Sequence, residues 1–145
     1  ALRDVTVNLS ESCDHVMYLG DAARVRQVLT NLLGNAVSFT PRCTSVEVIA
    51  SRVEDAPPGT PLSGGPWCVI RVVDRGPGIP EAMTERVFER FVQLDGDAAN
   101  TRSGRGLGLT FCKLAVEAHN GRCGLAPAAR SAFARSVENS CSNRR

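Results

Sequence analysis

The feature that most constrains the fold is a helical spacing of apolar side chains near the start of the chain. From Asp21 onward they recur every three or four residues, as they do in a helix with one buried face. Asp21 is a good N-cap residue, and Pro41 ends the pattern because proline cannot continue a helix. The apolar residues of this face are Val25, Val28, Leu29, Leu32, Leu33 and Ala36. We therefore expect an amphipathic helix between residues 21 and 41.

Runs of apolar residues on either side of this helix indicate β-strands. Residues 5–9 alternate between apolar and polar, and residues 16–19, 46–53 and 67–73 are further apolar runs. The run 67–73 is the densest, so we expect it to be the most buried strand. The segment 54–66 holds four prolines and three glycines, which indicates a surface loop joining a hairpin.

Two further helices are expected in the second half of the chain. Pro80 can start a short helix that runs to Phe91. Residues 107–119 have a second helical pattern, which Asn120 and Gly121 close. The sequence has no internal repeat, so we expect a single domain.

The composition fits a soluble globular domain with one core. The chain has 145 residues and no apolar run near the ~20 residues that a membrane span needs, and we expect no signal peptide at Ala1. Its six cysteines lack the paired short spacings of zinc sites, so we expect reduced thiols in the cytosol. Residues 1–121 carry 12 basic and 14 acidic side chains, which argues against a broad nucleic-acid surface.

The segment Asp74-Arg75-Gly76-Pro77-Gly78-Ile79 directly follows the densest strand pattern. An aspartate at the end of such a strand can accept a hydrogen bond from the exocyclic amine of a purine, and two glycines let the backbone pass close to a flat ring. An ordinary strand-to-helix turn also uses aspartate and glycine. Taken alone, this segment leaves both interpretations open.

A second glycine-rich segment, Gly104-Arg105-Gly106-Leu107-Gly108-Leu109, leads directly into a helical pattern. Closely spaced glycines expose backbone N–H groups at a helix N-terminus, where the dipole favours anions, so the segment can cradle a polyphosphate. It is not a Rossmann fingerprint, because it follows a polar stretch, and it lacks the Gly-Lys-Ser/Thr ending of a Walker loop. A purely structural loop is the alternative.

The first helix carries Arg24, Asn31 and Asn35 along one stripe at the edge of its apolar face. Asparagine carbonyls there can complete the shell of a Mg²⁺ ion that otherwise relies on waters and phosphate oxygens. The alternative is that these amides are solvated or locally hydrogen-bonded.

Together these segments resemble the sensor histidine kinases of the GHKL ATPase superfamily. Residues 24–36 resemble their N box, residues 74–79 their G1 box, residues 87–91 their F box and residues 104–109 their G2 box. The four motifs stand in family order over residues 21–121.

The resemblance implies an α/β fold of the Bergerat type, an α+β two-layer sandwich in which helices cover one face of a mixed sheet and a mobile lid closes over ATP. It implies that Asn35 binds Mg²⁺, that Asn31 lies near the phosphates, and that Asp74 holds the adenine amine. The lid would be residues 94–103. The other implied nucleotide-binding positions are Gly76, Gly78 and Ile79 around the adenine, and Arg102, Gly104, Arg105, Gly106, Leu107 and Gly108 at the lid and phosphate loop.

Two departures from the family pattern stand out. Ser38 takes the place where many members carry a lysine, so one positive charge near the phosphates is missing, and Arg102 or Arg105 can replace it. Residues 122–145 do not show the two alternating strands with which the family usually ends, although residues 131–137 can pair as one strand. We therefore expect one domain over residues 1–145 with an atypical C-terminal segment.

One position separates kinases from hydrolases in this superfamily. Gyrase-like, MutL-like and Hsp90-like ATPases resemble one another in having a water-activating glutamate one helical turn before the metal-binding asparagine, where this chain has Asn31. An amide cannot act as a general base. The resemblance therefore implies the ATP-binding catalytic domain of a two-component sensor histidine kinase. The alternative is a degenerate nucleotide-binding or protein-interaction module without phosphotransfer, and anti-sigma-factor kinases fit less well because they also carry the glutamate.

Neither histidine suits the role of phosphoacceptor. His15 lacks the sequence context of an acceptor helix, and His119 stands at a helix end, where a solvated or capping role is expected. We therefore expect the acceptor histidine on a dimeric helical domain N-terminal to this chain, and an isolated chain that is inactive in phosphotransfer. Downstream we expect a response regulator receiver domain. The expected localisation is cytoplasmic, without nucleic-acid or membrane contact by this domain.

Overall fold

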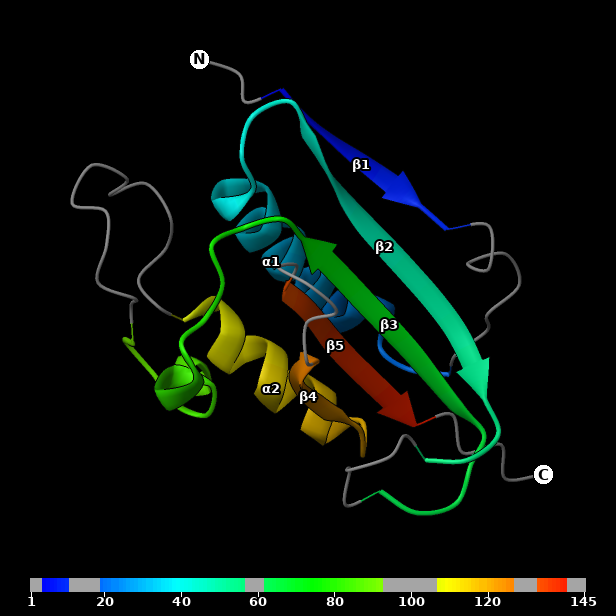
Figure 1. The fold of residues 1–145 in the computed structure, drawn as a ribbon. Helices are drawn as coiled ribbons and strands as arrows, with labels where there is room; N and C mark the ends of the chain where they lie inside the picture. The colour runs from blue at the N-terminus through cyan, green and yellow to red at the C-terminus, as the bar shows by residue number, and fades with distance from the viewer. Residues whose placement is uncertain (1–3, 11–18, 57–61, 93–106, 127–132, 141–145) are drawn as a thin grey trace.

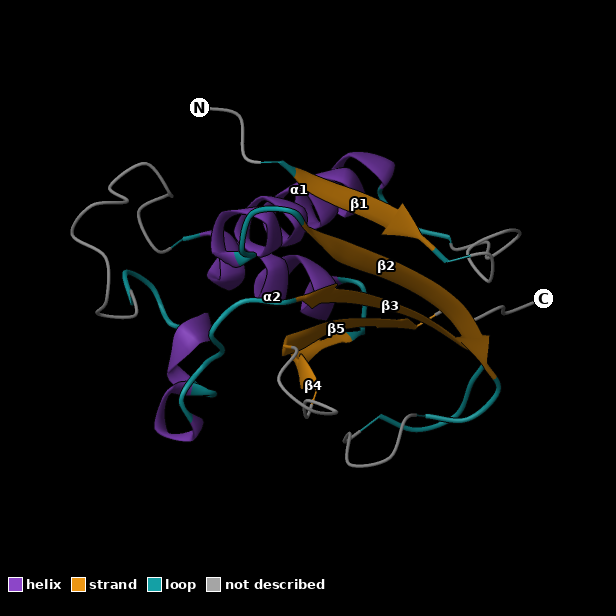
Figure 2. Ribbon diagram, turned by 45° about the horizontal axis from the view of Figure 1, so that its top comes forward, coloured by secondary structure: helices purple, strands orange, loops and turns teal. Residues whose placement is uncertain are grey.

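The computed structural model describes residues 4–10, 19–56, 62–92, 107–126 and 133–140. Within these ranges, helices cover one face of a five-stranded mixed sheet (Figures 1 and 2). The elements are β1 (Val5–Leu9), α1 (Ala22–Phe39), β2 (Thr44–Val53), β3 (Trp67–Asp74), the short 3₁₀ helices η2 (Glu81–Met83) and η3 (Arg86–Phe88), α2 (Gly108–Ala118), β4 (Arg122–Ala126) and β5 (Phe133–Ser140). This two-layer arrangement confirms the expected fold class.

The strand order in the sheet is β1-β2-β3-β5-β4. β1 runs parallel to β2, with Val7 opposite Val46, and every other pair is antiparallel. β2 and β3 form the expected hairpin, with Val48 opposite Val72. β3 therefore lies in the middle of the sheet, and its C-terminal end lies near the C-terminal end of α1 (Figure 1).

The core fills the space between the sheet and the two long helices. Its members from α1 are Val28, Leu32 and Ala36, those from α2 are Cys112 and Val116, and those from the sheet are Val46, Val72 and Cys123. Leu32, Val46 and Cys112 have 0% of their surface exposed. The apolar faces that the helical and strand spacings predict thus pack against one another in the core.

α1 matches the expected helix closely at both ends. The Asp21 carboxylate accepts hydrogen bonds from the backbone N–H groups of Ala23 and Arg24 at 2.9 and 3.1 Å, as an N-cap should. The helix ends at Phe39, with Thr40 in extended conformation before Pro41. The cap and the proline act locally, so the sequence alone could place both ends.

The prediction of one continuous short helix from Pro80 to Phe91 was wrong. The structure has two separate 3₁₀ turns there, each held by i to i+3 hydrogen bonds such as the one from Met83 N–H to Pro80 O at 2.8 Å. Only Val87 of these turns is buried, so there is no apolar face to hold a continuous α-helix against the core. Phe91 then has a φ of 64°, which ends the segment.

The C-terminal segment is also less atypical than expected. Two strands close the sheet, and the last one spans residues 133–140 instead of 131–137. β5 is inserted between β3 and β4 and is paired along both edges. Hydrogen bonds to β3 and β4 hold β5 in the sheet although its sequence does not alternate between apolar and polar residues. The alternation of residue types therefore did not predict β4 and β5 as the closing pair of strands.

Three smaller expectations can be compared with the described residues. The strand expected at 16–19 lies mostly outside them, and Leu19 itself is 87% exposed and not in a strand. Among the described residues, Cys43, Cys68, Cys112 and Cys123 form no disulfide bond. Within the described ranges, no helix is both long and apolar enough to cross a bilayer.

Candidate nucleotide-binding site

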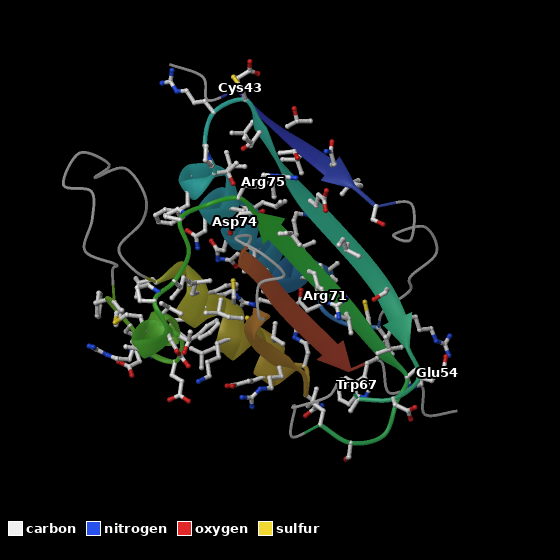
Figure 3. The ribbon with its side chains drawn as sticks, viewed as in Figure 1. Cys43, Glu54, Trp67, Arg71, Asp74 and Arg75 are labelled. Atoms are coloured by element: carbon white, nitrogen blue, oxygen red, sulfur yellow. The ribbon has the colours of Figure 1, made fainter. Side chains whose placement is uncertain are left out.

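The predicted site residues come from three elements that meet at one end of the sheet. Asp74 is the last residue of β3, Asn31 and Asn35 lie in the second half of α1, and Gly108 is the first residue of α2. Figure 3 shows Asp74 and Arg75 at the C-terminal end of β3, beside α1.

Asp74 is held in a fixed position at the buried end of β3. Asp74 is only 3% exposed, and its Oδ1 accepts a hydrogen bond from the Gly76 backbone N–H at 2.8 Å. A buried carboxylate needs hydrogen-bond donors, and the turn supplies one of them. The strand end and the turn therefore orient the carboxylate before any ligand binds.

The segment after Asp74 requires glycine at two places for different reasons. A Cβ on Gly76 would lie 2.9 Å from Asp74 Oδ1 and 3.1 Å from the backbone oxygen of Phe39, so any side chain there would force its neighbours to shift. Gly78 has a φ of 99°, a conformation that other residues rarely adopt. Ile79 follows and is buried, with 8% of its surface exposed.

Thr40 fixes this segment to the end of α1, a role that the sequence analysis missed. It is 1% exposed, and its Oγ1 accepts a hydrogen bond from the Arg75 backbone N–H at 3.4 Å. A threonine after a helix carries no sign of this partner in the sequence, because the partner lies 35 residues away. The β3 end, the following turn and the end of α1 are thus joined to one another.

The amides of Asn31 and Asn35 face the start of α2. A Cβ placed on Gly108 would lie 3.8 Å from Asn31 Cγ and 3.8 Å from Asn35 Nδ2, which is ordinary contact distance. Both asparagines are half-buried. The structure therefore brings Gly108 into contact distance of two asparagines that lie far from it in the sequence.

The N-terminus of α2 presents backbone donors on this side of the site. Its N-cap residue, Leu107, is 40% exposed and makes no side-chain capping hydrogen bond. The first N–H groups of a helix lack partners within the helix, and the dipole places partial positive charge there. This end of α2 is suited to an anion.

Other predicted positions stand apart from this cluster or cannot be compared with it. Arg24 lies over the Phe111 ring, 6.0 Å from its centroid, and is about 10 Å along the helix from Asn31. Ser38 donates a hydrogen bond to the Gly34 backbone oxygen at 2.7 Å. Arg102, Gly104, Arg105, Gly106 and the expected lid, residues 94–103, lie outside the described residues.

The donor chemistry fits a nucleotide carrying a hard cation. Among the residues that the structure describes, no three His, Cys, Asp or Glu side chains gather as a metal site. The amide oxygens of Asn31 and Asn35 are oxygen ligands of the kind Mg²⁺ accepts alongside waters and phosphates. A cation here would accordingly depend on a phosphate ligand for most of its coordination.

Comparison with known proteins agrees with this geometry. Residues 20–140 match the family described as histidine kinase-, DNA gyrase B-, and HSP90-like ATPase. The chain is 46% identical over 112 residues to sensor histidine kinase AruS of Pseudomonas aeruginosa, a match that covers 77% of this chain and 10% of AruS. It is 43% identical over 106 residues to the probable sensor histidine kinase TcrY of Mycobacterium tuberculosis, covering 73% of this chain and 20% of TcrY. The chain thus spans a fifth or less of these relatives.

Solved structures show the same fold. Full-length ShkA in complex with AMPPNP superposes with a TM-score of 0.72 at 29% identity, over 94% of this chain and 26% of ShkA. The nucleotide-free catalytic domain of histidine kinase ThkA gives a TM-score of 0.70 at 20% identity, over 95% of this chain and 79% of the ThkA chain. The chain belongs to the histidine kinase-, DNA gyrase B- and HSP90-like ATPase family, and within it is the ATP-binding catalytic domain of a histidine kinase.

Proposed function

We propose that this domain binds Mg-ATP between the end of β3, the second half of α1 and the start of α2, and donates the γ-phosphate to a histidine on a separate dimerisation domain. The observation that carries the proposal is the approach of Gly108 to Asn31 and Asn35, on the same helix whose last residue, Phe39, lies against the turn after the buried Asp74. One end of this arrangement suits a base and the other suits phosphates.

At the base end, Asp74 would accept a hydrogen bond from the adenine amine. Its carboxylate is already oriented by Gly76, so little ordering is left for the ligand to impose. Gly76 and Gly78 would let the backbone approach the ring, and Ile79 would contribute apolar surface nearby. The oriented carboxylate supports recognition of a purine through one polar contact.

At the phosphate end, Asn35 would hold Mg²⁺ and Asn31 would lie against the phosphates. Leu107 and Gly108 would offer backbone N–H groups at the uncapped start of α2. Gly104 and Gly106 would extend this loop, and Arg102 or Arg105 would supply the positive charge that Ser38 does not. A bound Mg²⁺ would neutralise phosphate charge during transfer.

The proposed reaction is transfer to histidine and not hydrolysis. Asn31 stands where a general base would have to activate water, and its amide cannot accept a proton. Phosphoryl transfer depends mainly on positioning and charge stabilisation, which this site can supply without a base. The two ring nitrogens of His119 are already hydrogen-bonded to Asp21 and Ala115, which argues against His119 as the phosphoacceptor.

The relatives support the remaining parts of the proposal. Both are named as sensor kinases and are at least about five times longer than the matched region. We infer that the parent of this chain carries the acceptor domain, that a receiver-domain aspartate of a response regulator takes the phosphoryl group next, and that the domain works in the cytoplasm. The serine at position 38, where many family members carry a lysine, favours the alternative of nucleotide binding without transfer.

Calorimetric titration of Mg-ATP into the chain tests binding. Asp74→Ala and Asn35→Ala should each weaken binding at least about tenfold, because each leaves a buried partner unpaired at a cost of about 1–3 kcal/mol. The matched controls are Asp55→Ala and Asn8→Ala, which change exposed residues of the same type and should bind like the parent. Parent-like binding by both site variants would rule out this site.

Incubation with γ-labelled ATP tests transfer. The chain alone should acquire no stable label and hydrolyse ATP slowly, and an added histidine-bearing helical domain should become labelled. Binding without labelling of that domain would favour the non-transferring module. Stable label on His15 or His119 would contradict the assignment of the acceptor.

A further inference from the structure

His119 joins the end of α2 to the beginning of α1. It is the C-cap residue of α2 and is half-buried. Its Nδ1 lies 2.7 Å from the backbone oxygen of Ala115, and its Nε2 lies 3.1 Å from the backbone nitrogen of Asp21, 98 residues away. The sequence predicts a solvated or capping role for His119. The structure adds a hydrogen bond to the distant Asp21, which the sequence does not indicate.

The two partners determine the protonation of the ring. A carbonyl oxygen only accepts, so Nδ1 must carry the proton that it donates to Ala115. A backbone N–H only donates, so Nε2 must be the bare nitrogen that accepts from Asp21. The contact therefore requires the neutral Nδ1–H tautomer of His119.

The contact lies at one end of an antiparallel pair of helices. Asp21 faces His119 at the start of α1. Further along, the Cys112 thiol lies 3.6 Å from the backbone oxygen of Val28, and Gly108 faces Asn31 and Asn35. The His119 bond thus limits how far α2 can slide along α1, and the opposite end of the same helix is the phosphate end of the site.

Apolar packing and the His119 hydrogen bond act together at this end of the helix pair. Val25, Val28, Ile70 and Val116, together with His119, line a small cavity between the helices and the sheet. Val28 and Val116 are nevertheless buried, and the hydrogen bond of His119 adds a directional constraint to this apolar packing.

We infer that His119 is a positioning residue for the nucleotide site: its hydrogen bond to Asp21 holds α2 in the position along α1 that places Gly108 opposite Asn31 and Asn35. This inference rests on the proposed binding of ATP phosphates at that end. Asp21 is exposed, so water can replace the lost acceptor and folding stability should change little when the bond is removed.

Long-range proton–nitrogen NMR of the full chain tests the geometry without any nucleotide. Neutral histidine in water favours the Nε2–H tautomer, whereas His119 should be protonated at Nδ1. Finding Nε2–H at His119 would overturn the inference. This result does not depend on whether the chain binds ATP.

Titrations with Mg-ATP and with adenosine test the positioning role once the parent is shown to bind Mg-ATP. His119→Leu should weaken ATP about fivefold and leave adenosine unchanged, since one net hydrogen bond is lost far from the base. His119→Gln, whose Oε1 can accept from Asp21, should recover most of that loss. The exposed Glu117→Ala on the same helix is the control and should bind like the parent.

The possible outcomes separate the two proposals. A parent that does not bind Mg-ATP refutes the proposed function, while the NMR arm still tests the His119 contact. If the parent binds but His119→Leu binds equally well, or loses ATP and adenosine affinity alike, His119 does not position the phosphate end. Failure of His119→Gln to recover affinity would count against it too.

Discussion

Gly76→Ala should damage the base end of the site while leaving the fold recognisable. The added Cβ would lie 2.9 Å from Asp74 Oδ1, 3.1 Å from the Phe39 backbone oxygen and 3.2 Å from Phe39 Cβ. Two of these neighbours belong to the end of α1 and one is the carboxylate proposed to bind adenine. Because Phe39 is held by helix backbone, the carboxylate is the group that can move most easily. Crowding of this kind costs about 1–3 kcal/mol.

Two measurements test this reasoning. The melting temperature should fall by roughly 3–10 °C for a domain of this size. Displacement of Asp74 should weaken ATP and adenosine to a similar extent, by about tenfold or more, since a charge-assisted hydrogen bond of about 1.5–3 kcal/mol is lost.

Gly34→Ala is the matched control for that substitution. Gly34 lies within α1, and a Cβ there would meet nothing within 4 Å. Alanine should therefore raise helix stability by about 0.5–1 kcal/mol and leave nucleotide binding unchanged. If Gly76→Ala were as stable as the parent and bound adenosine equally well, the close approach of Gly76, Asp74 and Phe39 would not describe the molecule.

Three further substitutions probe separate parts of the site. Gly108→Ala, whose Cβ has ordinary contact distances of 3.8 Å, should leave the melting temperature nearly unchanged but weaken ATP more than adenosine in calorimetric titrations. Thr40→Val removes the acceptor of the Arg75 N–H and should lower stability by about 1–2 kcal/mol in urea unfolding, with ATP and adenosine weakened alike. Ser38→Lys should raise affinity for ATP but not for adenosine, and an unchanged ATP affinity would show that the missing charge is already replaced.

Local rules allowed the first helix and the central hairpin to be predicted from the sequence. Asp21 and Pro41 bound α1 because capping and ring geometry act over one helical turn. β4 and β5 were not predicted as a pair, because β5 depends on partners on both edges that no local pattern reveals. The helix expected after Pro80 failed for lack of a buried face, which only the tertiary structure could show.

The same distinction explains which residues of the proposed site could be predicted from the sequence. Asp74, Gly76 and Gly78 form a short contiguous motif whose residue types reflect their own backbone and nearest neighbours. Thr40 and His119 act through partners 35 and 98 residues away, and a lone threonine or histidine does not indicate such a partner. The roles of Thr40 and His119 could not be predicted because their hydrogen-bond partners are far away in the sequence.

α1 connects both ends of the proposed site, and this makes their contributions separable. Its 18 residues span about 27 Å at 1.5 Å per residue. Its end, through Phe39 and Thr40, contacts the segment after Asp74, whereas its start is held by His119. Changes at Gly76 or Thr40 should therefore alter recognition of the base, which ATP and adenosine share. Changes at Gly108 or His119 should weaken binding of ATP, through its phosphates, and leave adenosine unchanged, so the ratio of the two affinities identifies which end of the site a substitution has disturbed.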